Sequence, residues 1–303
     1  MKKTFYSNGK LFITGEYTVL DGAKAFALPT KFGQSLEVEP SNGNTIKWTS
    51  YDADGSIWFD EELPIEAIIS NQPHADKAEV ITLIKILHKA HKANPTVLQD
   101  SNGFTVNTRL TFPRHWGLGT SSTLINNVAQ WFNINAYTLL AESFGGSGYD
   151  IACAQHNTAV LYQINGSNPI VSSVDFNPVF KDNIWFVYLN QKQNSREAIA
   201  AYREHRKDIA PIIARIDALT NDAILARDTQ TFASALEKHE ALMAGLLGMA
   251  PVQERLFPDF KGVIKSLGAW GGDFVMAVAE DNQIHYFLDK GYKTIISYQA
   301  MIL

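Results

Sequence analysis

Residues 113–124 constrain the fold of this chain most, because they place two glycines between a predicted strand and a predicted helix. Apolar residues alternate over residues 104–112, which predicts the strand, and residues 122–132 have the pattern of a helix. Glycines let the backbone approach a ligand closely, and a helix start presents N–H groups and the positive end of its dipole to phosphate oxygens. We therefore predict a phosphate-binding loop made of Gly117, Leu118, Gly119, Thr120, Ser121 and Ser122.

This two-glycine pattern fits neither of two common nucleotide-binding loops. No Gly-Lys-Ser/Thr follows the glycines, so the segment is not a Walker A loop, and the third glycine of the Rossmann fingerprint is missing. Taken alone, the pattern is compatible with an ordinary tight turn as well as with an anion site. The choice between the two depends on the rest of the sequence.

Length and composition indicate a globular protein with two closely packed lobes. The chain has 303 residues, of which 46% are hydrophobic and 19% are charged. A net charge of -5 argues against binding to nucleic acid or to an anionic membrane surface. We find no apolar run near the ~18 residues needed to span a bilayer, and the single cysteine, Cys153, suits a reducing compartment. We expect a soluble, cytoplasmic protein.

The apolar patterns predict mixed strands and helices. Turn signals at residues 41–44 and 52–55 predict hairpins between neighbouring strands. Pro211 is expected to kink or divide a helical tract over residues 195–219. This mixture is typical of the α+β class rather than of a doubly wound parallel sheet. The predicted strands cover residues 10–14, 34–39, 45–51, 56–59, 104–112, 158–164, 184–189, 274–279, 284–288 and 294–299, and the predicted helices cover residues 76–93, 122–132, 137–144, 148–155, 195–219, 229–247 and 260–267.

Three further segments change the interpretation of the glycine loop. Residues 7–22 contain Ser-Asn-Gly-Lys and Gly-Glu-Tyr, and residues 145–154 contain Gly-Gly-Ser-Gly-Tyr-Asp. Residues 268–275 form a second glycine-rich segment, Gly-Ala-Trp-Gly-Gly-Asp-Phe-Val. In order and rough spacing, these segments and the loop resemble the signatures of the GHMP kinases, the family of galactokinase, homoserine kinase, mevalonate kinase and phosphomevalonate kinase. Trp270 and Asp273 stand where that family commonly has glycine.

The resemblance covers most of the chain and implies a fold, a cofactor and a domain division. It implies a two-lobed GHMP kinase fold, with an N-terminal lobe like domain 2 of ribosomal protein S5 over residues 1–170. Residues 171–303 would form a ferredoxin-like C-terminal lobe. ATP would bind at the glycine loop together with Mg²⁺, and the partner would be a small molecule, with the protein a monomer or a homodimer.

The resemblance also implies the catalytic residues. Asp150 would take the proton of the acceptor hydroxyl or orient that hydroxyl, and Lys10 would lie beside it and keep the carboxylate ionised. Without the other segments, Asp150 is better explained as an acidic residue favoured by the start of a helix. Ser121 would reach Mg²⁺, with Glu142 as the candidate carboxylate ligand or, alternatively, a solvated residue on its helix.

The remaining candidate residues concern the acceptor substrate. Gly-Glu-Tyr and Gly-Tyr-Asp resemble phosphomevalonate kinases more than mevalonate kinases. Lys192 and Ser195 follow a predicted strand and could bind an acidic group, although simple helix capping would use the same residues. The predicted substrate-binding residues are Glu16, Tyr17, Tyr149, Lys192, Ser195, Gly271 and Gly272.

These features predict an ATP-dependent kinase that acts on a small acidic metabolite, most readily mevalonate or 5-phosphomevalonate. An ATP-dependent diphosphomevalonate decarboxylase shares the fold and an aspartate, and is one alternative. A GHMP kinase for homoserine or a sugar is another. The departures at Trp270 and Asp273 also leave open a ligand-binding relative without catalytic activity.

Overall fold

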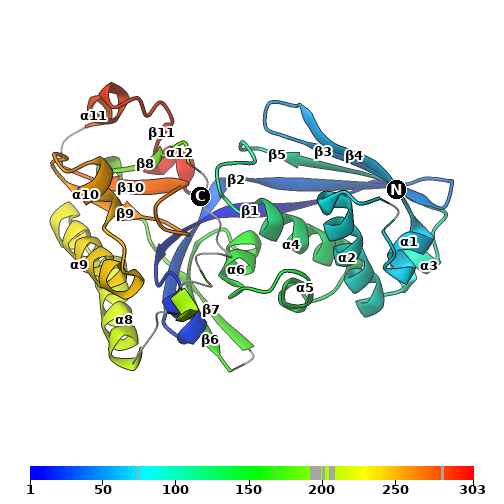
Figure 1. Cartoon of the computed structure of the whole chain (residues 1–303), viewed down its shortest axis with the longest axis horizontal. Helices are drawn as coiled ribbons and strands as arrows, with labels where there is room; N and C mark the ends of the chain where they lie inside the picture. Colours follow the sequence, from blue (N-terminus) through cyan, green and yellow to red (C-terminus); the bar gives the residue numbers. More distant parts are fainter. Residues whose placement is uncertain (74, 167, 192–198, 200–201, 205–208, 281–282) are drawn as a thin grey trace. The chain divides into compact units, whose positions relative to one another are not determined.

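The computed structural model in Figure 1 has the predicted α+β architecture. It describes residues 1–73, 75–166, 168–191, 199, 202–204, 209–280 and 283–303. The strands are β1 (Lys3–Thr14), β2 (Ala25–Pro40), β3 (Thr45–Tyr51), β4 (Ile57–Pro64), β5 (Phe104–Leu110), β6 (Ala159–Asn165), β7 (Asn168–Val174), β8 (Ile184–Tyr188), β9 (Val263–Ser266), β10 (Phe274–Val278) and β11 (Ile295–Ser297). The helices are α1 (Ile65–Ser70), α2 (Ala78–Ala93), α3 (Thr96–Gln99), α4 (Thr120–Phe132), α5 (Ala136–Ser143), α6 (Tyr149–Gln155), α8 (Ala210–Leu225), α9 (Thr229–Leu247), α10 (Val252–Leu256), α11 (Ile284–Asp289) and α12 (Tyr298–Met301).

The chain divides into two compact units, and each takes several separate segments of the sequence. Unit 1 contains Met1–Gly9, Phe32–Arg114 and Leu118–Gln155. Unit 2 contains Lys10–Lys31, His115–Gly117 and His156–Leu303. Strands β1 and β2 therefore each contribute residues to both units. The predicted boundary between residues 170 and 171 stays a prediction about the two lobes.

In unit 1, strands β4, β3, β5 and the second part of β2 form a sheet in that order. The turn at residues 52–55 joins β3 and β4 in an antiparallel hairpin, as predicted. The turn at residues 41–44 does not make a hairpin, because β5 lies between β2 and β3 and pairs in parallel with β3. Turn residues alone cannot reveal a third strand that inserts from later in the sequence.

Helices α2, α4 and α5 bury their apolar faces in the core of unit 1. The predicted face of α2, with Val80, Leu83, Ile84 and Leu87, is buried. It packs in one cluster with Trp48 of β3 and with residues of α4 and α5. Helix α4 thereby has a fixed position beside the sheet, and with it the end of the glycine loop.

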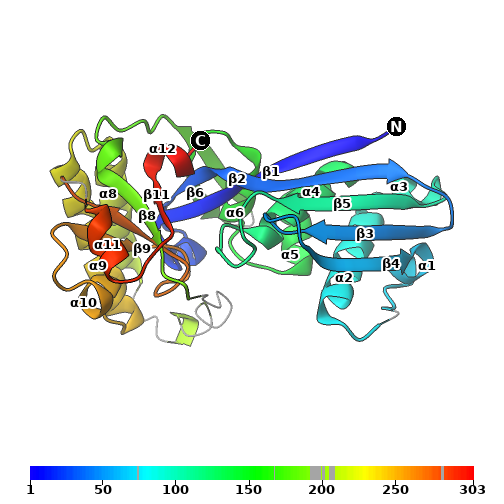
Figure 2. The same cartoon turned by 90° about the horizontal axis from the view of Figure 1, so that it is seen from above.

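In unit 2, four antiparallel strands form a sheet in the order β11-β8-β10-β9. Numbered by their own order in the chain, these strands have the arrangement 4-1-3-2, which is the ferredoxin-like order predicted for this part. The first part of β2 pairs with β6, and β6 pairs with β7, in the same unit. Figure 2 shows the strands β8, β9 and β11 near helices α8 and α9.

Two sequence predictions in unit 2 were wrong. Residues 260–267, predicted as a helix, contain strand β9, in which Val263 and Ile264 pair with Val278 and Ala277 of β10. Residues 284–288, predicted as a strand, form helix α11, which turns Phe287 against Phe257 with ring centroids 5.3 Å apart. In both segments tertiary contacts outweigh a short local pattern.

The other departures are smaller. Residues 294–299 split into the short strand β11 and helix α12. Pro211 lies in the first turn of α8, where its missing N–H costs nothing. Ile209 is not part of a helix and α8 begins at Ala210, so the predicted tract is divided next to Pro211 and α8 has no kink there to explain. None of the helices within the described residues is both long enough and apolar enough to span a bilayer.

The core of unit 1 provides a matched test within one helix. Ile84→Ala removes a fully buried side chain and should lower the free energy of unfolding by about 2–5 kcal/mol. Ile81→Ala truncates the same residue type at a position 43% exposed and should change it by less than about 0.5 kcal/mol. Urea unfolding of both variants measures the difference, and equal losses would contradict the assigned face of α2.

Candidate functional site

The glycine loop leads directly into α4, as predicted. Gly119 is the N-cap residue of α4 with φ 101°, and Gly117 has φ 70°, so both adopt the left-handed conformation that glycine tolerates best. No side chain caps the first turn of α4. Ser122 and Thr123 instead each donate a hydroxyl to the Gly119 carbonyl at 2.9 Å. The N–H groups of Thr120, Ser121 and Ser122 lack acceptors within the helix, which is the arrangement that binds anions.

The residues of this loop differ in exposure. Leu118 is fully buried and anchors the loop in the core, whereas Ser121 is exposed and Thr120 half-buried. His115–Gly117 belong to unit 2, and the loop from Leu118 onward belongs to unit 1.

A network of buried hydrogen bonds joins α4 to β1 and β2. Ser7 donates its hydroxyl to Asn127 Oδ1 at 2.7 Å and accepts from Asn126 Nδ2 at 2.9 Å. Thr123 donates to the side-chain oxygen of Gln34 at 2.9 Å, and Asn127 Nδ2 donates to the Gln34 carbonyl at the same distance. Because buried polar groups that are fully paired define a single arrangement, this network ties Ser7, at the start of the segment over residues 7–22, to α4.

Asp150 lies in the first turn of α6, half-buried, with Tyr149 buried beside it in the sequence. Helix α6 is joined to the same network through Gln155, whose Nε2 donates to Asn126 Oδ1 at 2.9 Å. Lys10 is a half-buried residue of β1 in unit 2, whereas Asp150 is in unit 1. Their pairing stays a prediction.

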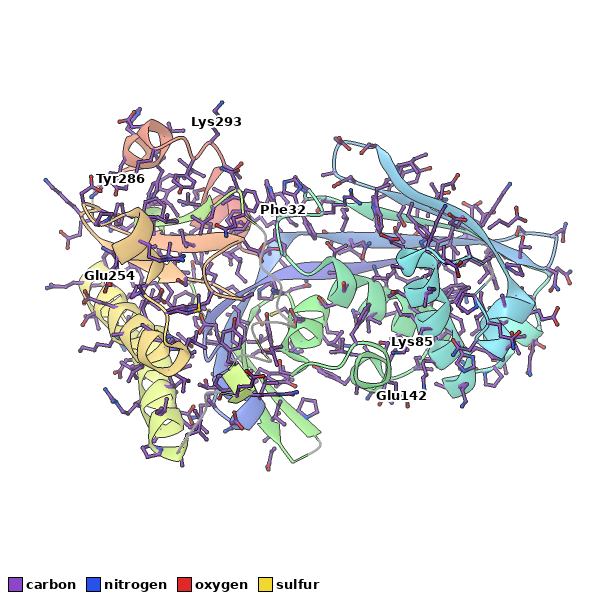
Figure 3. The ribbon with its side chains drawn as sticks, viewed as in Figure 1. Phe32, Lys85, Glu142, Glu254, Tyr286 and Lys293 are labelled. Atoms are coloured by element: carbon purple, nitrogen blue, oxygen red, sulfur yellow. The ribbon has the colours of Figure 1, made fainter. Side chains whose placement is uncertain are left out.

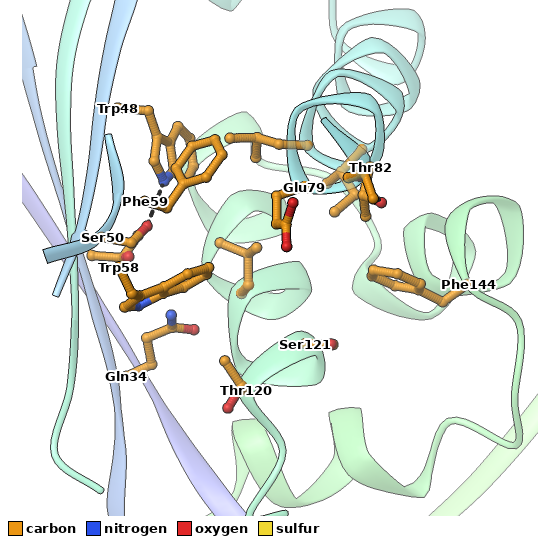
Figure 4. A pocket seen from close by; sticks show the side chains of 15 residues that line it. Gln34, Trp48, Ser50, Trp58, Phe59, Glu79, Thr82, Thr120, Ser121 and Phe144 are labelled. Carbon is orange, nitrogen blue, oxygen red and sulfur yellow. Dashed lines mark hydrogen bonds between the residues drawn. The ribbon is translucent and has the colours of Figure 1, made fainter. Parts of the chain in front are cut away.

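A pocket of about 300 Å³ opens beside the first turn of α4 in unit 1. Figure 4 shows Trp58, Phe59, Glu79 and Thr82 around it, together with Thr120 and Ser121 of the loop helix. The indole N–H of Trp58 is buried and has no hydrogen-bond partner among the described residues. The lining comprises Gln34, Trp48, Ser50, Trp58, Phe59, Ala78, Glu79, Thr82, Leu83, Ile86, Thr108, Thr120, Ser121, Leu124 and Phe144.

Sequence reasoning did not find this pocket. Its aromatic residues come from β3, β4 and the end of α5, and its polar residues come from β2, β3, β5, α2 and α4. These segments are far apart in the chain, so only the fold reveals that they share a cavity. The sequence shows only that Trp58 stands shortly after the turn residues 52–55, which does not reveal a cavity.

Glu142 lies elsewhere in unit 1. Its carboxylate pairs with Lys89 of α2 at 3.4 Å, and its side chain is 49% exposed. Figure 3 shows Glu142 on α5, where the neighbouring Ser143 carbonyl accepts from Lys85 Nζ at 2.8 Å. Glu142 does not line the pocket that contains Ser121, and its role as a metal ligand stays a prediction.

Glu16 is fully buried in unit 2, within a cluster of ionisable side chains. Lys265 Nζ lies 2.5 Å from Glu16 Oε1 and 3.1 Å from Glu240 Oε2. Glu240 Oε1 also accepts from the Ser266 hydroxyl at 2.5 Å and from the Ser266 N–H at 3.1 Å. His239 Nε2 accepts from the Gly15 N–H at 3.0 Å. We call Glu16, His239, Glu240 and Lys265 the buried ionic cluster.

Burial and mutual charge shift the pKa values in the buried ionic cluster. Burial raises the pKa of the Glu16 carboxyl to about 7, although the Lys265 ammonium lowers it in part. Burial also holds the pKa of His239 well below its ordinary value, with a further contribution from Lys265, so His239 is neutral. Burial alone would lower the pKa of Lys265, but the Glu16 and Glu240 carboxylates raise it.

Tyr17 is buried next to this cluster in the sequence. Its ring stacks on Tyr202 with centroids 5.6 Å apart, and the Tyr202 hydroxyl donates to Asp21 Oδ2 at 2.6 Å. The predicted substrate contacts of Glu16 and Tyr17 stay predictions. Lys265, Glu240 and His239 were missed because each occurs in an unremarkable amphipathic segment, and only the fold brings them to Glu16.

The second glycine-rich segment begins at Gly268, three residues after Lys265. Trp270 and Asp273 have φ values of 55° and 52°, so they keep the left-handed conformation that glycine would adopt there. A non-glycine residue in this conformation costs about 1–2 kcal/mol. Gly271 and Gly272 between them are buried. Lys192 and Ser195 lie outside the described residues.

Solved structures of known proteins share this arrangement over nearly the whole chain. Mevalonate kinase of Methanococcus jannaschii matches with a TM-score of 0.72 at 16% identity, covering 98% of this chain and 97% of that one. Phosphomevalonate kinase of Streptococcus pneumoniae, in complex with phosphomevalonate and AMPPNP, matches with 0.72 at 17% identity, covering 97% and 99%. Galactokinase of Lactococcus lactis, complexed with galactose, matches with 0.68 at 14% identity, covering 98% and 92%.

The chain has the GHMP kinase fold. No protein-family model matches the sequence, and neither does any curated protein. The GHMP kinase fold of this chain is visible in its structure, at 14–17% identity to these solved structures.

Removing the central cation tests the buried ionic cluster. Lys265→Met should lower the free energy of unfolding by about 3–5 kcal/mol, because Glu16 and Glu240 would remain buried without their cation. Lys261→Met, at an exposed position two residues before β9, is the matched control and should be nearly neutral. Denaturant unfolding at pH 8 compares them, and a loss below about 1 kcal/mol in Lys265→Met would contradict the pairing.

The raised pKa of Glu16 predicts a pH dependence of stability. In the unfolded chain this carboxyl ionises near its ordinary value of 4.5, whereas the folded protein keeps it protonated up to about 7. Between these values the unfolded state binds fewer protons, so the free energy of unfolding falls as pH rises, by up to about 3 kcal/mol. Glu16→Gln removes this term.

The wild type should therefore lose stability relative to Glu16→Gln between pH 4.5 and 7, and the difference should be constant above that range. Exposed Glu254 offers a control, since Glu254→Gln should follow the wild-type pH profile. Thermal unfolding across this range measures both. Parallel profiles for the wild type and Glu16→Gln would show that Glu16 is already ionised at pH 5.

Proposed function

We propose that the protein is an ATP-dependent kinase that transfers a phosphoryl group to a small acidic metabolite. The observation that carries this proposal is the junction in unit 1 where the glycine-capped start of α4 borders a pocket lined by aromatic side chains. An anion-binding helix start beside a cavity with aromatic walls and several polar groups suits the two chemically different parts of a nucleotide. The GHMP kinase fold supports the same assignment.

The pocket suits the base of the nucleotide. Trp58 and Phe144 offer aromatic surface, and the unpartnered indole N–H of Trp58 offers a donor to a ring nitrogen or carbonyl. Gln34, Glu79 and Thr82 add polar groups that can fix the orientation of a base. The phosphates would then lie over the first turn of α4, where Thr120 and Ser121 border the same cavity.

Magnesium is the metal that this chemistry requires, and one loop residue fits it. The exposed hydroxyl of Ser121 is an oxygen ligand at the phosphate-binding helix start, as Mg²⁺ prefers. Bound Mg²⁺ would neutralise charge on the phosphate oxygens. Glu142 fits less well, because its carboxylate pairs with Lys89.

Asp150 is proposed as the residue that acts on the acceptor. With mevalonate, its carboxylate would accept the proton of the acceptor hydroxyl, or orient that hydroxyl, while the hydroxyl oxygen bonds to the γ-phosphorus and ADP leaves. With 5-phosphomevalonate, the attacking atom is an oxygen of the acceptor phosphate, and Asp150 would take up any proton that this phosphate carries or help to orient it. Lys10 would keep the carboxylate ionised and polarise the hydroxyl. The network from Asn126 to Gln155 supports this role because it fixes α6 relative to the phosphate-binding helix.

Mevalonate or 5-phosphomevalonate is the acceptor that we propose. Gly15-Glu16-Tyr17 and Gly148-Tyr149-Asp150 are the sequence features that favour this branch, and they lean towards the phosphorylated substrate. A solved phosphomevalonate kinase with the same fold binds phosphomevalonate and AMPPNP together. On the sequence grounds given above, we also propose a cytoplasmic enzyme, monomeric or homodimeric.

Release of ADP by the purified protein with Mg-ATP tests the proposal directly. Mevalonate, 5-phosphomevalonate, diphosphomevalonate, homoserine and galactose are offered in turn, and we expect turnover with one of the first two. Carbon dioxide release with diphosphomevalonate would favour the decarboxylase instead. Nucleotide binding without turnover on any acceptor would refute the substrate assignment and leave the fold.

Variants of the catalytic pair test the mechanism. Asp150→Asn and Lys10→Met should each lower kcat by about 100-fold or more, with little change in ATP affinity, because neither residue belongs to the phosphate loop. Asp100→Asn, an exposed position in the same unit, should keep normal kcat. Near-normal turnover in Asp150→Asn would remove Asp150 from the mechanism.

A further inference from the structure

Asp273 occupies a strained position that glycine would occupy without strain. Its φ of 52° is left-handed, and the neighbouring Gly271, with φ 91°, shares this type of backbone. Aspartate tolerates this conformation better than most residues, but glycine tolerates it without steric cost. A non-glycine residue that keeps such a conformation in a candidate site points to a use for its side chain.

The side chain of Asp273 lies against Gly117 of the phosphate loop, and both residues belong to unit 2. A Cβ atom built at Gly117 would lie 2.9 Å from Asp273 Oδ1 and closer still to Cγ and Oδ2. The carboxyl group thus fills the space that a side chain at position 117 would need. With Asp273 in this position, residue 117 must be glycine, because any side chain there would collide with the carboxyl group.

The backbone of Asp273 is held firmly behind this contact. Its carbonyl accepts from the Leu189 N–H at 2.8 Å, and its N–H donates to the Gln191 carbonyl at 2.6 Å. Both partners lie just after β8, while Phe274 begins β10. The Asp273 carboxyl group is therefore carried by the end of the sheet in unit 2.

The residues just before Gly117 contact the same strands. Trp116 packs edge-on against Phe274 with ring centroids 5.4 Å apart, and Tyr188 donates its hydroxyl to the His115 carbonyl at 3.1 Å. His115, Trp116 and Gly117 thus all contact the ends of β8 and β10. Asp273 supplies the contact at the glycine itself.

We propose that Asp273 is a positioning residue for the phosphate loop, whose carboxyl group, packed against Gly117, fixes the loop conformation that receives the nucleotide phosphates. This inference rests on the proposed function. It explains why aspartate stands where glycine would relieve the backbone. It also assigns a role to a residue in which the sequence departs from the usual glycine-rich pattern.

Asp273→Gly separates this role from a merely structural one. Because glycine adopts the left-handed backbone without strain, the melting temperature of Asp273→Gly should equal that of the wild type or exceed it. The loop loses the support of the carboxyl group, so KM for ATP should rise about tenfold, with little change in KM for the acceptor. Asp273→Asn keeps the shape of the side chain and should restore KM for ATP to within about threefold of the wild type. Asn71→Gly, at an exposed left-handed position after α1, is the control and should leave KM for ATP unchanged.

A double-variant cycle tests the contact itself. Gly117→Ala should weaken ATP binding by collision with Asp273, and Gly117→Ala combined with Asp273→Gly should recover part of that loss because the collision is gone. The dissociation constant of ATP, measured by calorimetry, reads out the cycle without any turnover. Strictly additive effects, or a lower melting temperature with unchanged ATP affinity in Asp273→Gly, would overturn the proposal.

Different results would overturn the role of Asp273 and the proposed kinase function. A wild-type protein that binds ATP and turns over an acceptor, with Asp273→Gly equally competent, would overturn the role of Asp273 and leave the proposed function standing. A wild-type protein that does not bind ATP would overturn both.

Discussion

Pairing of buried charges is the constraint on which the C-terminal sheet and residues 15–17 both depend. The Glu16 and Glu240 carboxylates raise the pKa of buried Lys265, and the Lys265 ammonium in turn lowers the pKa of Glu16 in part, so each group favours the charge of its partner. These contacts fix the end of β1 against β9 and α9. Tyr17 follows Glu16 directly, and the second glycine-rich segment begins two residues after Ser266. The buried ionic cluster therefore positions the chain at both segments.

In unit 1, the buried polar side chains that join the strands to α4 are neutral. Ser7, Gln34, Asn126 and Asn127 are buried, and their hydrogen bonds join β1, β2 and α4 without any net charge. Amide and hydroxyl groups cost less to bury than ions once they are paired. The start of α4 can therefore remain rigid and still present its own N–H groups outward, as binding of a highly charged ligand requires.

Sequence reasoning succeeded where the signal is local and failed where it is not. Helix α9 and strand β3 lie at their predicted bounds, because each has a clear period and terminal residues that suit it. The aromatic pocket and the partners of Glu16 could not be predicted, since they combine segments from distant parts of the chain. At Trp270 and Asp273 the sequence showed only a departure from glycine, and the backbone angles show that the glycine conformation itself was kept.

The pairing of Glu16 with Lys265 joins residues 249 positions apart in the chain. At ribosomal rates of about 5–20 residues per second, Lys265 is synthesised roughly 12–50 s after Glu16. During that interval the Glu16 carboxylate has no cation to accompany it into the interior and stays in water. Residues 10–17 can therefore reach their final position only after Lys265 has been synthesised, and the nascent chain must keep them out of wrong pairings until then.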